Sequence, residues 1–535
     1  MATSNHSASS EKTSLLQLNQ PHDSHSHDAH VFDDVDVDLD IDMTELPIIT
    51  RTNSFSLASP SFQVSTHHMK VFDDDYDHEP EPVAYEEFQK LILLVFPVVA
   101  TYVLEYLPGM VCIMLVGHID SPESKEYVDA ATMSTMFTNV SALSIGFGLS
   151  SALDTLCSQA YGAGRLKKIG IYLQSGIIVV GSCLIPIFLL NWHSGWFLLK
   201  MGLDPEVARL AGEFSQITVF GIPFLFAYEM CRKLMQAQNI TKPLVVIMIC
   251  GNCVNIFGGY YLTYHTSMGF HGAALSRTLG YVALPILLVP YFLISPTYKQ
   301  WWPGWNLKEA WAHVGIFLRL GVPGLLMMAM EWWAYEILGV MAGNLPDSVV
   351  SVSAHAVLMN VASSLYMFYL GIAVSGNIRV GNSLGANLPK KARLISRITM
   401  SIVFSLSLFF ALLVWIYRYE IPKLLMNDPV AIQRAADCLL VMVPYEIIDA
   451  LNCVIQGIFR GTGRQNMAAK SNAVAFYAVG VPIAAVLAFR FQFGVEGLWI
   501  GFMLGIFTAF SVCTTILYHS SWQQMAKEAQ ERTAH

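Results

Sequence analysis

The residues of this sequence that could do chemistry are a few carboxylates inside long apolar segments. Glu331 has Trp332 and Tyr335 beside it, and Glu336 follows five residues later. A charged carboxylate in the middle of a membrane span costs roughly 2.5–3.5 kcal/mol on insertion scales, so it needs a proton, a cationic partner or a wet cavity. Aromatic faces can also hold an organic cation by cation–π attraction. Because a proton and a cationic molecule would compete for one carboxylate, Glu331 is the first candidate for a residue that couples their movements.

A second candidate group lies in a later apolar segment. Polar side chains recur there at helical spacings of i, i+4, i+7 and i+11, in one stripe along a helix: Tyr445, Asp449, Asn452 and Gln456. A polar stripe inside a span faces a cavity or forms hydrogen bonds to a neighbouring helix. We expect Asp449, Asn452 and Gln456 to face the cavity, with Asp449 as the second protonatable acid. Helix–helix hydrogen bonding is the alternative.

Three further residues complete the candidate site. Glu105 has, in the first half of the chain, the place that Glu331 has in the second, so it is either a further protonation site or a structural residue. Glu336 lies about 140° round the helix from Glu331, because each residue adds about 100°, and we expect it to face a different neighbour. Asn360, in the next segment, is expected to be a neutral ligand near Glu331.

The elements that must position these residues are membrane-spanning helices. Of the 535 residues, 54% are hydrophobic and only 13% are charged, whereas about 25% are charged in an average soluble domain. The apolar residues form twelve blocks, each near the length of about 20 residues that crosses a bilayer. We therefore expect an all-α polytopic membrane protein. Its helices are predicted at 88–117, 126–158, 169–191, 205–236, 243–264, 269–295, 311–342, 347–378, 392–417, 428–458, 468–490 and 494–519.

The two halves of the chain repeat one another. Three pairs of residues match at a constant offset of 226: Pro97 with Pro323, Glu105 with Glu331, and Gly117 with Gly343. Six spans per half give both halves the same orientation, so the symmetry axis should lie along the membrane normal. We predict twelve transmembrane helices in two pseudo-symmetric six-helix lobes around a central cleft, an N-lobe at 88–310 and a C-lobe at 311–520.

The charges are distributed unevenly along the chain, whose net charge is −9. Residues 1–90 carry 18 acidic and 4 basic residues, and high charge with few aromatics is typical of disorder. We expect a disordered acidic cytoplasmic tail at 1–87 and a short cytoplasmic tail at 521–535. One set of breaks between spans carries 15 Lys and Arg against 8 in the other set, which places that set and both termini in the cytoplasm.

Several function classes find no support in the sequence. It has no nucleotide-binding loop, metal triad or nucleophile–base pair, so we expect no enzyme activity, no bound metal and no cofactor beyond a proton or sodium gradient. Its basic residues do not form one stripe, so we expect no nucleic acid partner. The expected partners are a small-molecule substrate, membrane lipids and sorting adaptors, because Glu11–Leu16 resembles an acidic dileucine signal.

Five segments resemble eukaryotic members of the multidrug and toxic compound extrusion (MATE) family. They are Val116–Ile119, Gly146–Gly162, Met330–Glu336, Arg379–Ala386 and Arg460–Gly463, in the family's order across residues 88–519. The resemblance implies a proton- or sodium-driven antiporter that expels organic cations, drugs or secondary metabolites by alternating access, with Glu331 as its acid in span seven. Animal members have an acid in span eight where this chain has Asn360, so the plant and fungal pattern, with the acid Asp449, fits better.

Two other transport functions stay open at this point. An organic-anion exporter, for example of citrate, and a flippase for lipid-linked precursors would both favour basic residues in the central cavity. The membrane is open as well. A detoxifying transporter would be expected in the plasma membrane, whereas the dileucine match favours the vacuolar or lysosomal membrane.

Overall fold

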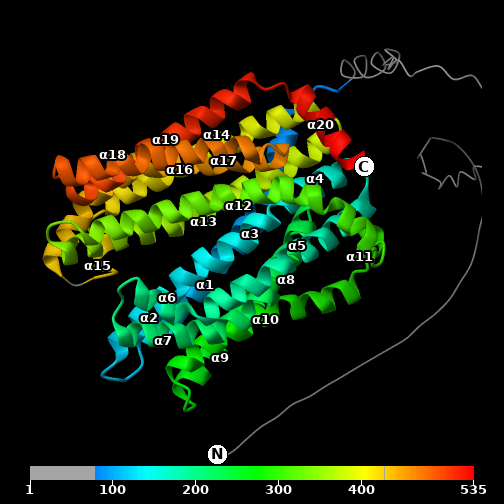
Figure 1. The fold of residues 1–535 in the computed structure, drawn as a ribbon. Coiled ribbons are helices and arrows are strands. Elements are labelled where there is room, and N and C mark those ends of the chain that lie inside the picture. Colours follow the sequence, from blue (N-terminus) through cyan, green and yellow to red (C-terminus); the bar gives the residue numbers. More distant parts are fainter. Residues whose placement is uncertain (1–78, 427, 535) are drawn as a thin grey trace, which may run out of the picture. The chain divides into compact units, whose positions relative to one another are not determined.

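The computed structural model describes residues 79–426 and 428–534, all of whose regular elements are helices (Figure 1). Twelve of these helices are long and apolar enough to cross a membrane, as the sequence predicts, and their ends agree with the predicted ones within seven residues. Most of the acidic tail and the dileucine match at Glu11–Leu16 lie outside the described residues, so both stay predictions.

The first half supplies spans one to six. They are α1 (Ala84–Gly117); α2 (Ser124–Thr138), a π-helical turn, α3 (Ser144–Ser150) and α4 (Ala152–Gly162), which together make span two; α5 (Leu166–Trp192); α7 (Pro205–Thr218) with α8 (Ile222–Ala237); α9 (Lys242–Tyr264); and α10 (Phe270–Ile294). The short helices α6 (Ser194–Lys200) and α11 (Tyr298–Trp301) lie between spans.

The second half supplies spans seven to twelve. They are α12 (Leu307–Gly343); α13 (Ser348–Gly385); α14 (Pro389–Tyr417); α16 (Pro429–Thr462); α17 (Gln465–Asn472) and α18 (Val481–Ala485), which form span eleven with one π-helical segment between them and a second after α18; and α19 (Gly494–His519). The short α15 (Glu420–Lys423) precedes α16, and α20 (Trp522–Ala534) follows the last span.

Equivalent helices of the two halves begin with the same chemical signal. Asp204 accepts a hydrogen bond from the backbone N–H of Glu206 at the start of span four, and Asp428 accepts one from Val430 at the start of span ten. A proline occupies the first turn in both cases, where no intrahelical N–H bond is lost. The repeat in the sequence is therefore a repeat of local structure as well.

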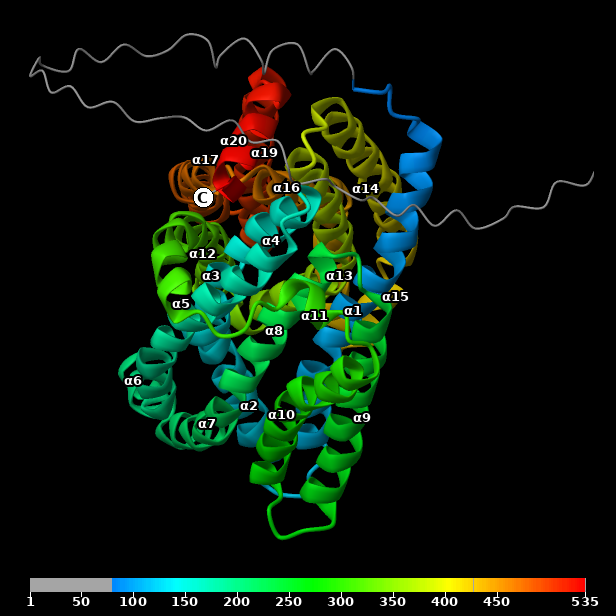
Figure 2. The same cartoon turned by 90° about the vertical axis from the view of Figure 1, so that its right-hand side faces the viewer.

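The first span of each half also packs against the other half. Helix α1 runs along α13, and α12 runs along α3 and α5 (Figure 2). Spans two, eight and ten meet at their C-terminal ends. There Thr155 Oγ1 donates to the Arg460 carbonyl at 2.5 Å, and Gln159 Nε2 donates to the Gly461 carbonyl at 2.9 Å. A Cβ atom on Gly385 would collide with the carbonyl of Gln159, so this contact between the halves requires glycine.

The last residues, which we expected to form a tail, fold into α20 and dock at this same end. Arg532 Nη1 donates to Gln159 Oε1 of the first half at 2.5 Å, while Arg464 Nη2 of the second half donates to Glu528 Oε1 at 3.1 Å. The small apolar face of α20 is buried, as helical spacing requires: Met525, Ala526 and Ala529. Helix α20 therefore bridges the two halves.

The structure corrects part of the charge count that predicts the orientation. Arg232 and Lys233, counted as residues of a break, lie inside α8, and Arg277 lies inside α10. All three are at most 7% exposed. Each therefore acts as an internal charge rather than as a topology signal. Without them the excess of basic residues on the predicted cytoplasmic side is smaller but keeps its sign, and the orientation stays a prediction.

Candidate functional site

A cavity of about 280 Å³ lies between the two halves, and its wall is acidic and aromatic. Helix α12 contributes Glu331, Trp332, Tyr335 and Glu336, and α13 contributes Tyr366 among others. The first half reaches the cavity from α1 and from the π-helical turn of span two. The wall holds two carboxylates and no Lys, Arg or His, which is a suitable surface for a cation with an apolar body.

Glu331 faces this cavity and forms no ion pair, although Arg460 of α16 lies within electrostatic range of it. In the described part of the chain, no basic nitrogen lies within 4.0 Å of its carboxylate. It stands eight residues after Pro323, which removes one backbone hydrogen bond inside α12. The carboxylate is therefore free to take a proton or a cationic ligand, as the sequence suggests.

Glu336 lines the same cavity, although we expected it to face a different neighbour. The cavity is wide enough to extend over more than one face of α12, and Trp332 and Tyr335 line it as well. Trp333 alone in this run is turned outward, with 52% of its surface exposed. The prediction used the angle of about 140° between the two residues around the helix and did not take the width of the cavity into account.

The stripe of polar residues on α16 lies behind the cavity wall. Asp449, Asn452 and Gln456 are 2%, 1% and 4% exposed, and none of them is a lining residue. Gln456 Nε2 donates to Asn472 Oδ1 at 2.6 Å, so this part of the stripe forms hydrogen bonds within the second half. Within the described residues, the Oδ1 atoms of Asp449 and Asn452 have no hydrogen-bond partner. Asp449 lies within electrostatic range of Glu331.

A hydrogen bond between two tyrosines connects the cavity with this stripe. The hydroxyl of Tyr335, on the cavity wall, bonds to the hydroxyl of Tyr445, which is fully buried one turn before Asp449. Either hydroxyl can act as the donor. The helix that carries Glu331 is thereby attached to the helix that carries Asp449.

Asn360 does not reach the cavity. Its side chain is exposed, and its Nδ2 atom donates to the carbonyl of Ala356 in its own helix at 2.8 Å. The preceding residue, Met359, does line the cavity. Since neighbouring residues are about 100° apart on a helix, Asn360 is turned away from the wall.

Glu105 has a different environment from its counterpart Glu331. The Nη1 atom of Arg232 donates to Glu105 Oε2 at 2.6 Å, and Arg232 also pairs with Glu229. Lys233 completes the network, because it contacts Asp154 at 2.9 Å and Glu229 at 3.4 Å. Two built-in cations therefore balance most of the charge of these three acids of the first half.

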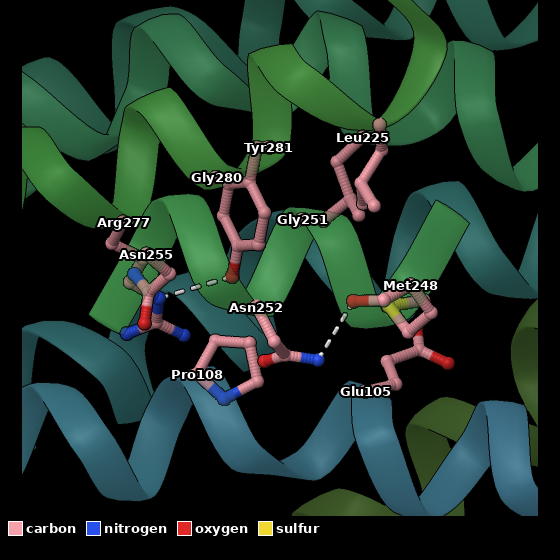
Figure 3. Close-up of a pocket in the computed structure, with 11 residues that line it drawn as sticks. Glu105, Pro108, Leu225, Met248, Gly251, Asn252, Asn255, Arg277, Gly280 and Tyr281 are labelled. Carbon is pink, nitrogen blue, oxygen red and sulfur yellow. Dashed lines mark hydrogen bonds between the residues drawn. The ribbon is translucent and has the colours of Figure 1, made fainter. Parts of the chain in front are cut away.

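A second cavity, of about 30 Å³, lies beside Glu105 (Figure 3). Asn252 Nδ2 donates to the Met248 carbonyl at 3.0 Å, and Arg277 Nε donates to the Tyr281 hydroxyl at 3.0 Å. Both side-chain atoms of Asn255 lack a hydrogen-bond partner among the described residues. This space holds about one water molecule, so it is too small for an organic substrate.

Sequence reasoning missed several charged residues of the spans. Glu446, fully buried one turn before Asp449, accepts a hydrogen bond from the Tyr369 hydroxyl at 3.1 Å. The position of Glu446 inside predicted span ten was a signal in the sequence that could have identified it. Glu229, Arg232 and Lys233 were missed as a group, although their i, i+3 and i+4 spacing places them on one face of α8.

Twelve helices in two repeated halves, with an acidic cavity between them, define a membrane transporter. The family model MatE matches residues 97–261 and 323–486, two segments that begin at Pro97 and Pro323 and confirm the repeat. The chain belongs to this family of multidrug and toxin extrusion transporters, and it is an efflux transporter and not an enzyme.

Individual relatives agree with this assignment over most of their length. The chain is 31% identical to multidrug and toxin extrusion protein 1 of Mus musculus, over 84% of this chain and 78% of that protein. It is 30% identical to Protein DETOXIFICATION 16 of Arabidopsis thaliana, over 84% and 91% respectively. The crystal structure of the eukaryotic MATE transporter AtDTX14 superimposes with a TM-score of 0.80 at 29% identity, covering 84% of this chain and 99% of that one.

Proposed function

We propose that this transporter exports organic cations, such as xenobiotics or secondary metabolites, in exchange for protons. The observation that carries this proposal is the wall of the cavity between the halves. It presents the carboxylates of Glu331 and Glu336 beside aromatic rings, and it contains no basic residue. Such a wall attracts a cation with an apolar body, because charges interact strongly where water is sparse.

Exchange follows from competition for one group. When Glu331 is ionised, it pairs with the cationic substrate. When it is protonated, the attraction is lost and the substrate leaves. A ligand that binds only one of two states shifts the equilibrium by its difference in affinity, so proton and substrate each displace the other. Asp449 takes part as the second acid, connected to the cavity wall through the bond between Tyr335 and Tyr445.

Transport then requires rocker-type alternating access. The halves are in contact where spans two, eight and ten end, through bonds such as Gln159 to Gly461. By the predicted orientation this end is cytoplasmic, so the structure corresponds to a state closed toward the cytoplasm. Opening that end must break these bonds and close the opposite end, as in other transporters built from two repeats.

The second candidates have less support. An exporter of organic anions or a flippase for lipid-linked precursors would need basic groups in the cavity between the halves, and the wall of that cavity has none. Sodium remains the alternative coupling ion, because carboxylate oxygens also bind sodium.

We assign the protein to the plasma membrane, with both termini in the cytoplasm. The vacuolar or lysosomal membrane is the alternative if adaptors recognise Glu11–Leu16. Replacing Leu15 and Leu16 by alanine and observing a move to the plasma membrane would support the alternative.

The test is uptake of a fluorescent organic cation into proteoliposomes under an outward-directed proton gradient or sodium gradient. We expect the proton gradient to drive uptake, Glu331→Gln to abolish the coupled uptake, and Glu420→Gln to leave it unchanged. Glu420 is a suitable control because it is an exposed acid paired with Lys423 far from the cavity. Uptake driven by the sodium gradient alone would mean that sodium, and not the proton, is the coupling ion. Failure of both gradients with a panel of cations, together with uptake of an anion, would overturn the substrate class.

A further inference from the structure

Glu446 is a buried acid that the exchange described above does not use. It is 0% exposed in the middle of α16, and Tyr369 of α13 donates to its Oε2 atom at 3.1 Å. Its Oε1 atom has no hydrogen-bond partner among the described residues. Asp449 lies one turn further along the same helix and is 2% exposed, so two carboxyl groups are buried side by side.

The helices around Glu446 bring no cation to it. Helix α13 presents Tyr369, and its Arg379 is paired with Glu87 of α1. Helix α12 brings Tyr335 within electrostatic range of Glu446. The charged residues of α14 are confined to its first turns, at 390–397. On α19 the only acid, Glu496, is paired with Arg434 far along α16. An ionised carboxylate buried without a cation is costly, so in this state Glu446 is expected to carry a proton.

The two halves of the protein differ in how they neutralise their acids. In the first half, Arg232 and Lys233 neutralise most of the charge of three acids. In the second half, no Lys or Arg of the described chain forms an ion pair with Glu331, Glu446 or Asp449. Arg460 of α16 lies within electrostatic range of Glu331, but no basic residue does so for Glu446 or Asp449, so protons or the substrate must supply the positive charge there. Three acids in one region are more than the exchange of one proton for one monovalent cation requires.

Glu446 is also placed so that it can lose its proton. The Tyr369 hydroxyl already points at the carboxyl group and stabilises the ionised form when it appears. The unpartnered oxygens of Asp449 and Asn452, on the same face of α16, can accept water when the halves separate.

We propose that Glu446 is a second proton-binding residue, so that two protons cross the membrane for each monovalent organic cation. This inference rests on the proposed proton exchange. One proton is held by Glu331 and Asp449 together and the other by Glu446, and both protons leave to water on the side opposite to that from which they entered. Two protons against one monovalent cation move one net positive charge, so transport depends on the membrane potential.

The sign of this dependence separates it from a leak. When an organic cation enters a vesicle and two protons leave, positive charge leaves, so an inside-positive potential must favour uptake. Passive leakage of a cation is favoured by the opposite potential. A potential of about 60 mV corresponds to about a tenfold change in the accumulation ratio for one moved charge.

The experiment measures the accumulation of a fluorescent monovalent cation in proteoliposomes of the full chain, with equal pH on both sides and a potassium–valinomycin potential. We expect an inside-positive potential of about 60 mV to raise accumulation by the wild type about tenfold. Glu446→Gln keeps the size of the side chain and an acceptor for Tyr369, and it should lose this response while a proton gradient still drives uptake. Glu446→Asp should restore the response.

Two results would overturn the inference. The first is that accumulation by the wild type responds to the proton gradient but not to the membrane potential. The second is that Glu446→Gln responds to the membrane potential as the wild type does. Both leave the proposed proton exchange intact. Failure of the wild type to respond to the proton gradient itself would instead contradict the proposed function. If Glu446→Gln does not fold, a wild type that is indifferent to the potential still overturns the inference, and Glu446→Asp tests the residue.

Discussion

Arg232 forms an ion pair with Glu105, with 2.6 Å between Nη1 and Oε2, at the position where the second half leaves Glu331 unpaired. The two acids have the same place in the repeat, but only Glu105 forms an ion pair, whereas Arg460 lies within electrostatic range of Glu331 without pairing with it. The halves of this transporter have therefore taken different roles. The first is stabilised by a fixed charge network, and the second keeps its carboxylates available for mobile ligands.

The charge network of the first half should be needed for stability. Replacing Arg232 by Met leaves Glu229 and Glu105 without their main cation, and breaking a buried ion pair in this way costs about 3–5 kcal/mol. We expect a large fall in the melting temperature of the detergent-solubilised protein. Combining Arg232→Met with Glu229→Gln should recover part of the loss, because the second change removes one unpaired charge. A double variant no more stable than Arg232→Met would contradict this account.

The bond between Tyr335 and Tyr445 should contribute to coupling. Replacing either tyrosine by Phe removes the bond, and one net hydrogen bond contributes about 1 kcal/mol, or about fivefold in an equilibrium. We expect Tyr335→Phe and Tyr445→Phe each to slow proton-driven uptake about fivefold. The double variant should be no slower than either single variant, since both remove the same interaction. If the reduction in rate of the double variant equals the product of the two single reductions, the hydroxyls act separately.

Glu336 should contribute to substrate binding more than to coupling. It lines the cavity with Glu331, and removing one carboxylate from a partly dry site weakens its attraction for a cation by about 1–2 kcal/mol. We expect Glu336→Gln to raise the KM for a cationic substrate about tenfold. The final accumulation at a fixed proton gradient should stay at the wild-type level. Loss of that accumulation would mean that Glu336 is itself a coupling residue.

Binding of a cationic substrate should weaken as the pH falls. Protons and substrate compete for the Glu331 carboxylate, so each proton displaced on binding lowers the affinity by up to about tenfold per pH unit in the acidic range. The measurement is the Kd of a labelled cation for purified protein at several pH values. In Glu331→Gln the affinity should be weak, with a reduced dependence on pH. An unchanged dependence in the variant would locate the competition elsewhere.

Helix α20 should help to hold one end of the transporter closed. Arg532 donates to Gln159 of the first half, whereas α20 is also attached to the second half through Arg464. A hydrogen bond that involves a charged group contributes about 1.5–3 kcal/mol. We expect Arg532→Ala to increase the fraction of molecules open at this end at least tenfold. Spin labels at Lys167 and Ala386, both exposed, would report it as a longer distance.

The matched control for this measurement is a change on the solvent side of α20. Lys527 is exposed, and no ion pair or hydrogen bond to its side chain is found in the described chain. Lys527→Ala should therefore leave the distance between the labels unchanged. An equal shift in both variants would mean that the helix, and not the bond of Arg532, controls the opening.

The sequence by itself determined the helices and their repeat. Hydropathy over about 20 residues, Asp-Pro at helix starts and the offset of 226 are local or periodic signals, and the twelve spans follow from them. The sequence also identified the acids of α12 and α16, because a carboxylate inside a span is unusual wherever the neighbouring helices lie.

Only the tertiary structure decided which acids are paired and which are free. Glu105 and Glu331 are equivalent in the sequence, but Arg232, 127 residues from Glu105, reaches only the first of them. In the same way, the rotation of α13 turns Asn360 away from the cavity, while the width of the cavity includes Glu336. These outcomes depend on the rotation and tilt of helices far apart in the chain, and local periodicity does not specify either quantity.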